Sequence, residues 1–349
     1  TGPAIAVEAR GTPDQLSGSA RVTDLSVLSP EIAGAAAARF EAVQEGEAWR
    51  ITAEGAGDRV RADDPYGELL GARPRLQFAG VADGGGVTIQ RATVIGPRLR
   101  LGVRGRASGD ALDLAWEASG RGPISVAGVG IVGAVDVSGR VLGRPSAPRV
   151  TGVGELATLD LGALALSPAQ VRFAYADGTG AVSLSGLYGD QPFTAMGDVI
   201  VRDGTVAVEG LTADLAGLSV QGSLSVTSGA LAGSFDVQGP LAGLTGEAGS
   251  ITARLGLSGT GEQPVLDGRG LVRGAQFGGA AVNEAAFAFS GPLEDLRLGA
   301  TAQGAVSGTA FDLGATGTAS VRDGTIAVAA SIEGTAAGLP VRSVEPLQY

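Results

Sequence analysis

The glycine string at residues 128–133 is the first feature of this sequence with a pattern that could do chemistry. Its residues, Gly-Val-Gly-Ile-Val-Gly, match the Gly-x-Gly-x-x-Gly pattern that binds the pyrophosphate of dinucleotides. That function requires a helix N-terminus directly after the string, whereas residues 134–139 alternate as a strand does. Because the chain holds 59 glycines, a chance match is expected. We therefore assign no dinucleotide site.

Two pairs of adjacent carboxylates, Asp63-Asp64 and Glu294-Asp295, could act as acid and base or bind calcium. Each pair lies beside a proline or a proline-containing turn, and no ladder of Asp and Gly at calcium-loop spacing follows either pair. The chain has no His and no Cys, and all 25 basic residues are Arg. This composition removes imidazole, thiol and Schiff-base chemistry and nearly all zinc sites. We expect solvated turns, no catalytic residue, no cofactor, no metal, and a protein that is not an enzyme.

A basic stripe is formed by four arginines, Arg98, Arg100, Arg104 and Arg106. Their even spacing predicts that all four lie on one outer face of a strand. Such a stripe can contact lipid phosphates or a partner, or it can be an ordinary charged surface that keeps a β-structure soluble. The net charge of −11 argues against a phosphate-backbone partner, so we expect no nucleic acid.

The elements that must position these residues are predicted to be strands. Residues 219–226 alternate strictly between polar and apolar, and similar short runs recur between Asp-Gly, Ser-Gly, Glu-Gly and Gly-Pro turns. This pattern predicts an antiparallel meander. The uncharged stretch from Leu215 to Phe235 also alternates, so it indicates strands rather than a membrane helix. The Ala-rich stretch 31–43 fits a helix or a strand, and we favour a strand with Ala36, Ala38 and Phe40 on one face.

Internal repeats organise the chain. Residues 201–208, Val-Arg-Asp-Gly-Thr-Val-Ala-Val, recur with one conservative difference at 321–328, and a looser copy lies at 81–89. Other positions repeat at shifts of about 116 to 120 residues. We predict three β repeats in one continuous structure, residues 1–120, 121–240 and a truncated third repeat at 241–349.

The copies agree on which positions are bulky and apolar. We expect these residues to share one face: Val87, Ile89, Leu99, Leu101, Val206, Val208, Val220, Leu224, Val226, Ile326 and Val328. With 15 aromatic residues and no predicted helices to cover it, such a sheet must fold over on itself, which predicts an all-β, elongated and curved antiparallel sheet. These residues either line an open groove or close on each other as a dry core.

The sequence resembles the TamB-like and AsmA-like periplasmic proteins of Gram-negative bacteria, the inner-membrane components of translocation and assembly modules. The residues that carry the resemblance are two Gly-x-x-x-x-Pro-x-x-x-Gly stretches, 143–152 and 259–268, and the run Ser290–Leu298. The resemblance implies a sheet folded into a taco-like hydrophobic groove. Neither the N-terminal membrane anchor nor the characteristic C-terminal end of that family is visible, so we expect an internal fragment.

The resemblance also implies a function. It suggests a periplasmic bridge between the inner and outer membranes that conducts phospholipid, assists outer-membrane protein assembly, or does both. The implied partners are phospholipid acyl chains and an outer-membrane barrel of the assembly-module type. The parent protein would be anchored in the inner membrane outside this fragment.

A second interpretation is a β-solenoid stalk of a secreted adhesin or autotransporter. Right-handed solenoids usually have coils of about 20 to 25 residues and ladders of Asn or Gly. Here the repeats are far longer, and Asn283 is the single asparagine. A polysaccharide-processing β-helix enzyme would need a convergent acidic or basic site, and the sequence contains none that we recognise.

Overall fold

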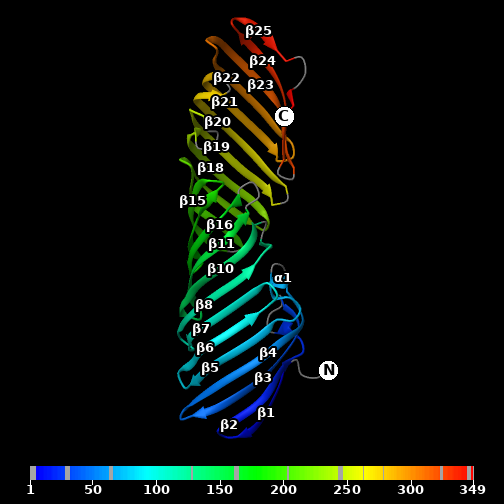
Figure 1. The fold of residues 1–349 in the computed structure, drawn as a ribbon, viewed down its shortest axis with the longest axis vertical. Helices are drawn as coiled ribbons and strands as arrows, with labels where there is room; N and C mark the ends of the chain where they lie inside the picture. The colour runs from blue at the N-terminus through cyan, green and yellow to red at the C-terminus, as the bar shows by residue number, and fades with distance from the viewer. Residues whose placement is uncertain are drawn as a thin grey trace. The chain divides into compact units, whose positions relative to one another are not determined.

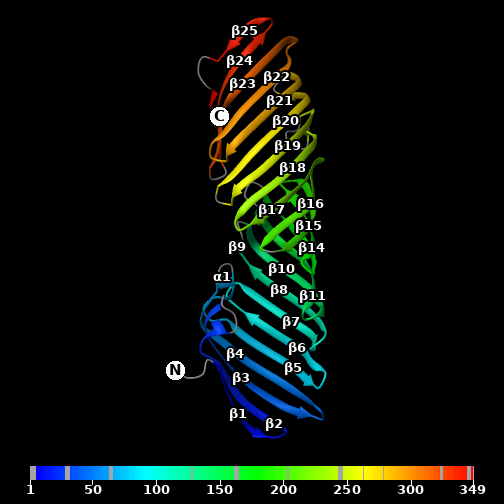
Figure 2. The same cartoon turned by 180° about the vertical axis from the view of Figure 1, so that it is seen from behind.

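The computed structural model describes residues 5–27, 32–62, 66–126, 129–160, 165–202, 204–242, 247–261, 263–277, 279–322, 325–343 and 347–348. The protein is all-β, with 81% of its residues in strands, and its antiparallel sheet is open rather than closed into a barrel (Figure 1, Figure 2). The predicted fold class is thereby confirmed. The chain forms two compact units, unit 1 (residues 1–177) and unit 2 (residues 178–349).

Unit 1 is a meander in which most strands pair antiparallel with the next strand along the chain. Its strands are β1 (Ile5–Thr12), β2 (Gln15–Val22), β3 (Ile32–Glu45), β4 (Ala48–Ala62), β5 (Arg75–Asp83), β6 (Gly86–Ile95), β7 (Leu99–Ala107), β8 (Leu112–Arg121), β9 (Ile124–Val126), β10 (Val129–Arg144), β11 (Ala147–Asp160), β12 (Ala165–Leu166) and β13 (Ala169–Ala176). β10 pairs with both β8 and β9, and β11 pairs with both β12 and β13. A 3-10 turn, η1 (Leu25–Val27), and one short helix, α1 (Tyr66–Leu70), are its described helical segments.

Unit 2 continues the same type of meander. Its strands are β14 (Thr179–Tyr188), β15 (Gln191–Arg202), β16 (Thr205–Leu215), β17 (Leu218–Thr227), β18 (Ala230–Pro240), β19 (Ser250–Thr260), β20 (Pro264–Phe277), β21 (Ala280–Pro292), β22 (Leu296–Val306), β23 (Thr309–Arg322), β24 (Thr325–Ala336), β25 (Leu339–Arg342) and β26 (Leu347–Gln348). β24 pairs with both β25 and β26. Every pairing between described strands of this unit is antiparallel, as local hairpin connections require.

Three stretches with alternative interpretations are strands in the structure. The Ala-rich stretch forms β3, and the uncharged stretch 215–235 runs from the end of β16 through β17 into β18. The described part of the glycine string, residues 129–133, lies within β10, so no helix follows it. Among the residues that the structure describes, no helix is long and apolar enough to cross a membrane.

The copies of the repeated octapeptide form equivalent hairpins. Val201 lies opposite Val206 at the β15–β16 turn, and Val321 lies opposite Ile326 at the β23–β24 turn. The looser copy joins β5 to β6 in the same way. The boundary between the two units, after Asp177, falls inside the expected second repeat at 121–240. The division into three repeats therefore stays a prediction.

Strand register sorts the side chains of each unit into two faces. Residues directly opposite each other in an antiparallel pair point to the same side of the sheet. In unit 2, Val208 lies opposite Leu224, which lies opposite Gly233 and is followed across the next strands by Leu257 and Leu266. We call the face that carries Leu101 in unit 1 and Leu224 in unit 2 the apolar face, and the opposite side the polar face.

A β-bulge keeps the apolar residues of β16 on one face. Val206 and Val208 are even-numbered, whereas Leu211 and Leu215 are odd-numbered, so strict alternation would send the two pairs to opposite faces. The register shifts between Val208 and Leu211, and Gly210 adopts a positive φ of 57° there. An equivalent shift in unit 1 separates residues 89 and 92 of β6.

Large rings lie over glycines on the apolar face. Trp116 of β8 and Phe173 of β13 stack with ring centroids 6.2 Å apart, although two strands separate them. They meet above Gly139 and Gly152, where a Cβ at Gly139 would lie 2.7 Å from Trp116 Cζ2. Because these glycines have no side chain, few aromatic residues suffice to cover the sheet.

We predict that Gly139→Ala destabilises the protein by about 1–3 kcal/mol, because the added methyl overlaps the Trp116 ring and the Thr151 carbonyl oxygen. The matched control is Gly109→Ala, where nothing lies within 4 Å of the added Cβ. The control should change the unfolding free energy by less than about 0.5 kcal/mol. Urea unfolding followed by circular dichroism measures both, and equal losses would show that the glycine is not required for ring packing.

Candidate functional site

The predicted apolar residues of unit 1 lie together on the apolar face. Val87 and Ile89 are in β6, where they lie opposite Ala107 and Gly105 of β7. Leu99 and Leu101 are on the same side of β7. All four predicted side chains are half-buried. The register therefore gathers residues that the sequence places on separate strands.

The corresponding residues of unit 2 also share its apolar face. Val206 lies opposite Val226, and Val208 lies opposite Leu224. The others are placed by the same ladder: Val220 lies opposite Ala213 and Val237, Val328 lies opposite Ala319, and Ile326 lies opposite Val321 with its side chain outside the described residues. Val206 is 43% exposed, and the other described side chains of this set are half-buried.

Partial burial is characteristic of this face. Across the described residues, 13 hydrophobic side chains are buried, and Leu166 is the one large side chain that is completely enclosed. None of the predicted apolar-face residues with a described side chain is among those 13. A packed sandwich of this length would enclose many more large side chains in its interior. The apolar face therefore keeps surface available for an apolar ligand.

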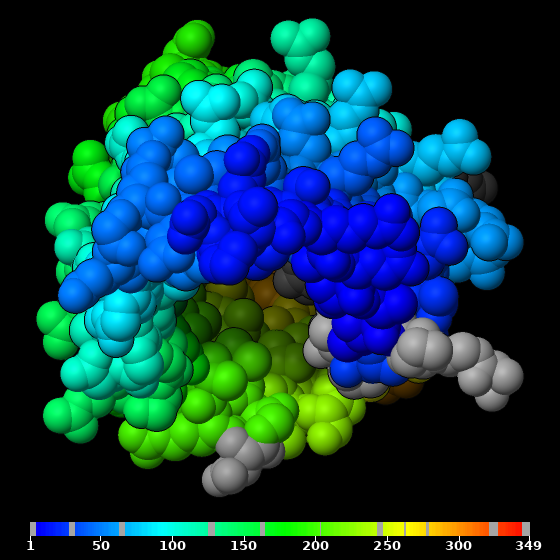
Figure 3. Space-filling view, turned by 90° about the horizontal axis from the view of Figure 1, so that it is seen from below, coloured from blue at the N-terminus to red at the C-terminus, as the bar shows by residue number. Residues whose placement is uncertain are grey.

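A cavity of about 330 Å³ opens on the apolar face of unit 1. The space-filling view shows the molecule hollowed beside the first strands of this unit, drawn in blue (Figure 3). The apolar-face residues that line the cavity are Ala38, Ala53, Gly55, Leu76, Phe78, Ala92, Val94, Leu101 and Val103. These side chains offer no hydrogen-bond donor or acceptor, whereas Glu54, Gln77 and Thr93 of the polar face also border the cavity. The predominantly apolar lining suits hydrocarbon.

Cavities also lie over the polar face, which sequence analysis did not anticipate. In unit 2, cavities of about 700 and 610 Å³ are lined by polar-face side chains such as Thr301, Arg254 and Arg269. In unit 1, a cavity of about 870 Å³ is lined by five arginines, Arg91, Arg100, Arg104, Arg140 and Arg172. Three of these were missed because they lie on β6, β10 and β13, away from the predicted stripe on and beside β7.

Of the four predicted arginines, Arg98 and Arg106 have carboxylate partners, whereas Arg100 and Arg104 have none among the described residues. Arg100, Arg104 and Arg106 lie on the polar face of β7, and Arg98 directly precedes this strand. Arg98 Nη1 donates hydrogen bonds to Glu68 Oε2 at 3.2 Å and to the Pro123 carbonyl oxygen at 3.0 Å. Arg106 is likewise bound.

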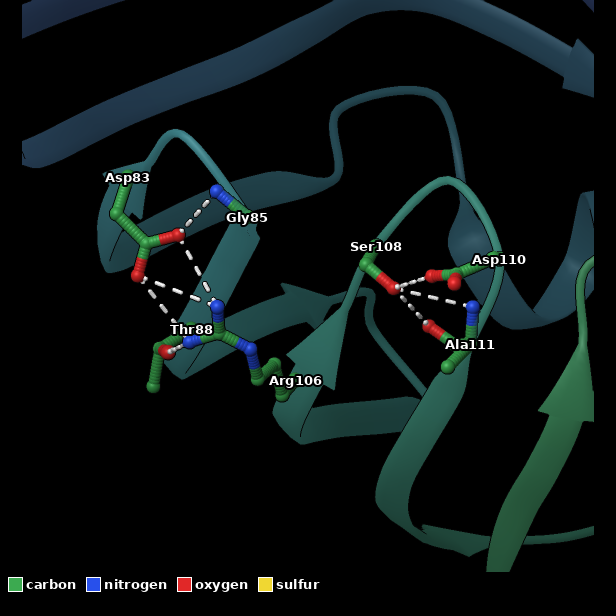
Figure 4. A network of polar contacts seen from close by, with 7 residues as sticks. All are labelled: Asp83, Gly85, Thr88, Arg106, Ser108, Asp110 and Ala111. Atoms are coloured by element: carbon green, nitrogen blue, oxygen red, sulfur yellow. Dashed lines mark hydrogen bonds and ion pairs between the residues drawn. The ribbon is translucent and has the colours of Figure 1, made fainter.

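Arg106 anchors the turn between β5 and β6. Its Nη2 donates to Asp83 Oδ1 at 3.0 Å and its Nη1 donates to Thr88 Oγ1 at 3.2 Å (Figure 4). The hydrogen bond from Arg106, with a second from the Gly85 amide, lowers the pKa of the Asp83 carboxyl. Arg106 therefore has a structural role. Arg100 and Arg104, by contrast, make no ion pair with any described residue.

Of the two carboxylate pairs, Glu294-Asp295 lies within the described residues and gains no partner there that would make it a metal site. Glu294 and Asp295 lie in the turn between β21 and β22, where the Asp295 amide donates to the Pro292 carbonyl oxygen at 2.9 Å. Asp63 and Asp64 lie outside the described residues. Within the described ranges, no group of three or more potential metal-ligating side chains occurs.

Comparison of the chain with family models, with curated proteins and with solved structures finds no match. The resemblance suggested by the sequence therefore stays an expectation. The function must rest on the two faces of the sheet, one apolar and partly accessible and the other polar with an arginine-lined depression.

We predict that Asp83→Asn removes an acid-sensitive part of the stability. Because the pKa of folded Asp83 lies below its ordinary value of 3.8, the ion pair stabilises the fold above that value and is lost as the pH falls through the folded-state pKa. At pH 7 the variant should have a lower urea concentration at its unfolding midpoint than wild type. The difference between the two midpoints should shrink below pH 3.8. In a double-mutant cycle, Asp83→Asn should have no further effect in an Arg106→Met background. Additive effects would mean that the two side chains do not interact.

Proposed function

We propose that this chain is an internal stretch of a periplasmic bridge-like scaffold whose apolar face conducts phospholipid, assists outer-membrane protein assembly, or does both. The observation that carries the proposal is the apolar face itself, which follows the strand ladder through each unit and is only half-buried. An apolar sheet face must be covered, and on this proposal the hydrocarbon of the cargo covers the part that the protein leaves accessible.

The energetics support acyl chains as the ligand. Burying a methylene group is worth about 0.8 kcal/mol, so full burial of a 16-carbon chain is worth about 13 kcal/mol relative to water. Even partial burial along the apolar face would remove much of the cost of moving lipid through water. The chain has no Lys and therefore no P-loop lysine. Transport along it would follow a gradient or be driven by another protein.

The proposed location and partners rest on the sequence resemblance to TamB-like and AsmA-like proteins. On this proposal the parent protein is anchored in the inner membrane and meets an outer-membrane barrel of the assembly-module type. Phospholipid and nascent outer-membrane protein both remain candidate cargoes, because each presents extended apolar groups to such a face.

The stalk interpretation receives less support. Coils of a β-helix solenoid pair in parallel, whereas the pairings between successive strands here are antiparallel. An elongated adhesin stalk would also have no need for a hydrocarbon-lined cavity such as the one in unit 1.

Leu224 provides the test of the conduit. It is half-buried on the apolar face, opposite Val208 and Gly233, whereas neighbouring Ser223 is exposed on the polar face. A photocrosslinking residue at position 224 should label phospholipid in cells, and the same residue at 223 should not. Leu224→Asp should leave the fold largely intact, because its carboxylate can reach water, but should reduce lipid labelling at a second apolar-face position, Val220. Ser223→Asp should change neither property.

Two results would contradict the proposal. Equal labelling from positions 223 and 224 would mean that lipid does not distinguish the faces. Unfolding of Leu224→Asp, without lipid labelling at 224 or 220 in the otherwise unchanged chain, would mean that the apolar face is a dry core, since an uncompensated buried carboxylate is strongly destabilising.

A further inference from the structure

We propose that the polar face of unit 1 docks an extended acidic segment of a partner protein in the depression lined by Arg91, Arg100, Arg104, Arg140 and Arg172. We call these residues the arginine depression. By register, the five arginines lie on the side of the sheet opposite the apolar face, although residues of the apolar-face positions, among them Val103, Trp116 and Phe173, also border the depression. It is a second site, distinct from the residues proposed to hold lipid.

Strand register assembles the depression from distant parts of the chain. Arg104 lies opposite Ala115, which lies opposite Arg140. Across β11, Arg140 lies opposite Thr151, and Arg172 lies opposite Val153, two residues further along the same strand. The six strands involved, β6, β7, β8, β10, β11 and β13, span about 24 Å at ~4.8 Å per strand. The depression has a volume of about 870 Å³.

The charges in the depression are largely unneutralised. Arg140 is paired with Asp113 at 2.7 Å, and the other four arginines make no ion pair with a described residue. Glu117 is the one carboxylate among the lining residues. It lies over Gly102, where a Cβ would be 3.0 Å from Glu117 Oε1, and it has no cationic group within 4.0 Å among the described residues.

This accumulation differs from the charge of the rest of the chain. Residues 1–177 contain 18 Arg against 20 acidic residues, and residues 178–349 contain 7 Arg against 16 acidic residues. Residues 86–106 alone contain five Arg and no acidic residue. Just outside the depression, Arg98 and Arg106 have carboxylate partners. Four arginines without an ion pair among the described residues therefore line one hollow of the sheet, although other described arginines of unit 1, such as Arg10 and Arg21, also lack one.

The shape and chemistry of the depression favour an acidic peptide segment. Guanidinium forks match carboxylate groups, and several separate forks require several anionic groups on one ligand. An extended segment of about seven residues spans 24 Å and presents carboxylates on one side at alternate positions. A lipid held on the apolar face has its headgroup separated from these arginines by the sheet.

The test is peptide binding by the full 349-residue chain. A fluorescein-labelled peptide of about 12 residues with alternating Glu and Ser should bind, as measured by fluorescence anisotropy, whereas its Gln/Ser counterpart should not. Raising NaCl from about 20 mM to about 300 mM should weaken binding about ten-fold or more. The variant Arg100→Gln/Arg104→Gln should also lose about ten-fold in affinity.

The matched control is Arg10→Gln/Arg21→Gln, which removes two polar-face arginines of unit 1 outside the depression. It should change affinity less than about two-fold. Unchanged urea midpoints would establish that both double variants are folded. Because the site is independent of the apolar face, lipid labelling at position 224 should be unaffected by either double variant.

Three outcomes would overturn the proposal. Equal losses in both double variants would mean non-specific attraction to the polar face. Failure of the Glu/Ser peptide to bind, with phosphatidylglycerol vesicles binding in a manner that requires Arg100 and Arg104, would assign the depression to a membrane surface. Displacement of the peptide by millimolar inorganic phosphate would mean that these arginines hold a small anion rather than an extended segment.

Discussion

The antiparallel ladder is the constraint on which the rest of this structure depends. Each residue shares its face with the residue opposite, so an apolar side chain on one strand determines which positions must be apolar on the next. One example is a row of facing residues on four successive strands, all on the apolar face: Val208, Leu224, Gly233 and Leu257. Where the alternation within a strand changes phase, a bulge such as the one between Val208 and Leu211 restores the common face.

Glycine allows a thin sheet to be stable with few aromatic residues. Trp116 and Phe173 reach each other across two intervening strands because Gly139 and Gly152 leave room for their rings. In unit 2, Phe287 and Phe289 stack along a single strand, β21, with ring centroids 6.5 Å apart and with Gly270 and Gly268 opposite them. Side chains that lie flat on the sheet bury backbone and neighbouring methyl groups at once. The same arrangement leaves the apolar face half-buried, which is the property that a hydrocarbon ligand would use.

The sheet separates two kinds of surface that could otherwise interfere. Hydrocarbon and unpaired guanidinium groups are incompatible on one surface, because burying an unpaired charge is costly. Here Arg98 and Arg106 are bound by the carboxylates of Glu68 and Asp83, while Arg100 and Arg104 make no ion pair with a described residue over a depression. A single layer of strands can thus present an apolar ligand site and an anion-binding site back to back.

The sequence by itself determined the strands and their faces. Alternation in residues 219–226 predicted β17, and the repeated apolar pairs predicted that Val208 and Val226 share a face, because period-two alternation is a local property of the chain. For the Ala-rich β3 the sequence fits a helix or a strand, since alanine suits both. Only the tertiary structure decided which side chains from distant strands meet, as Arg91, Arg140 and Arg172 do, and how deeply each face is buried. Those properties depend on register and sheet curvature accumulated over many strands, which no local pattern encodes.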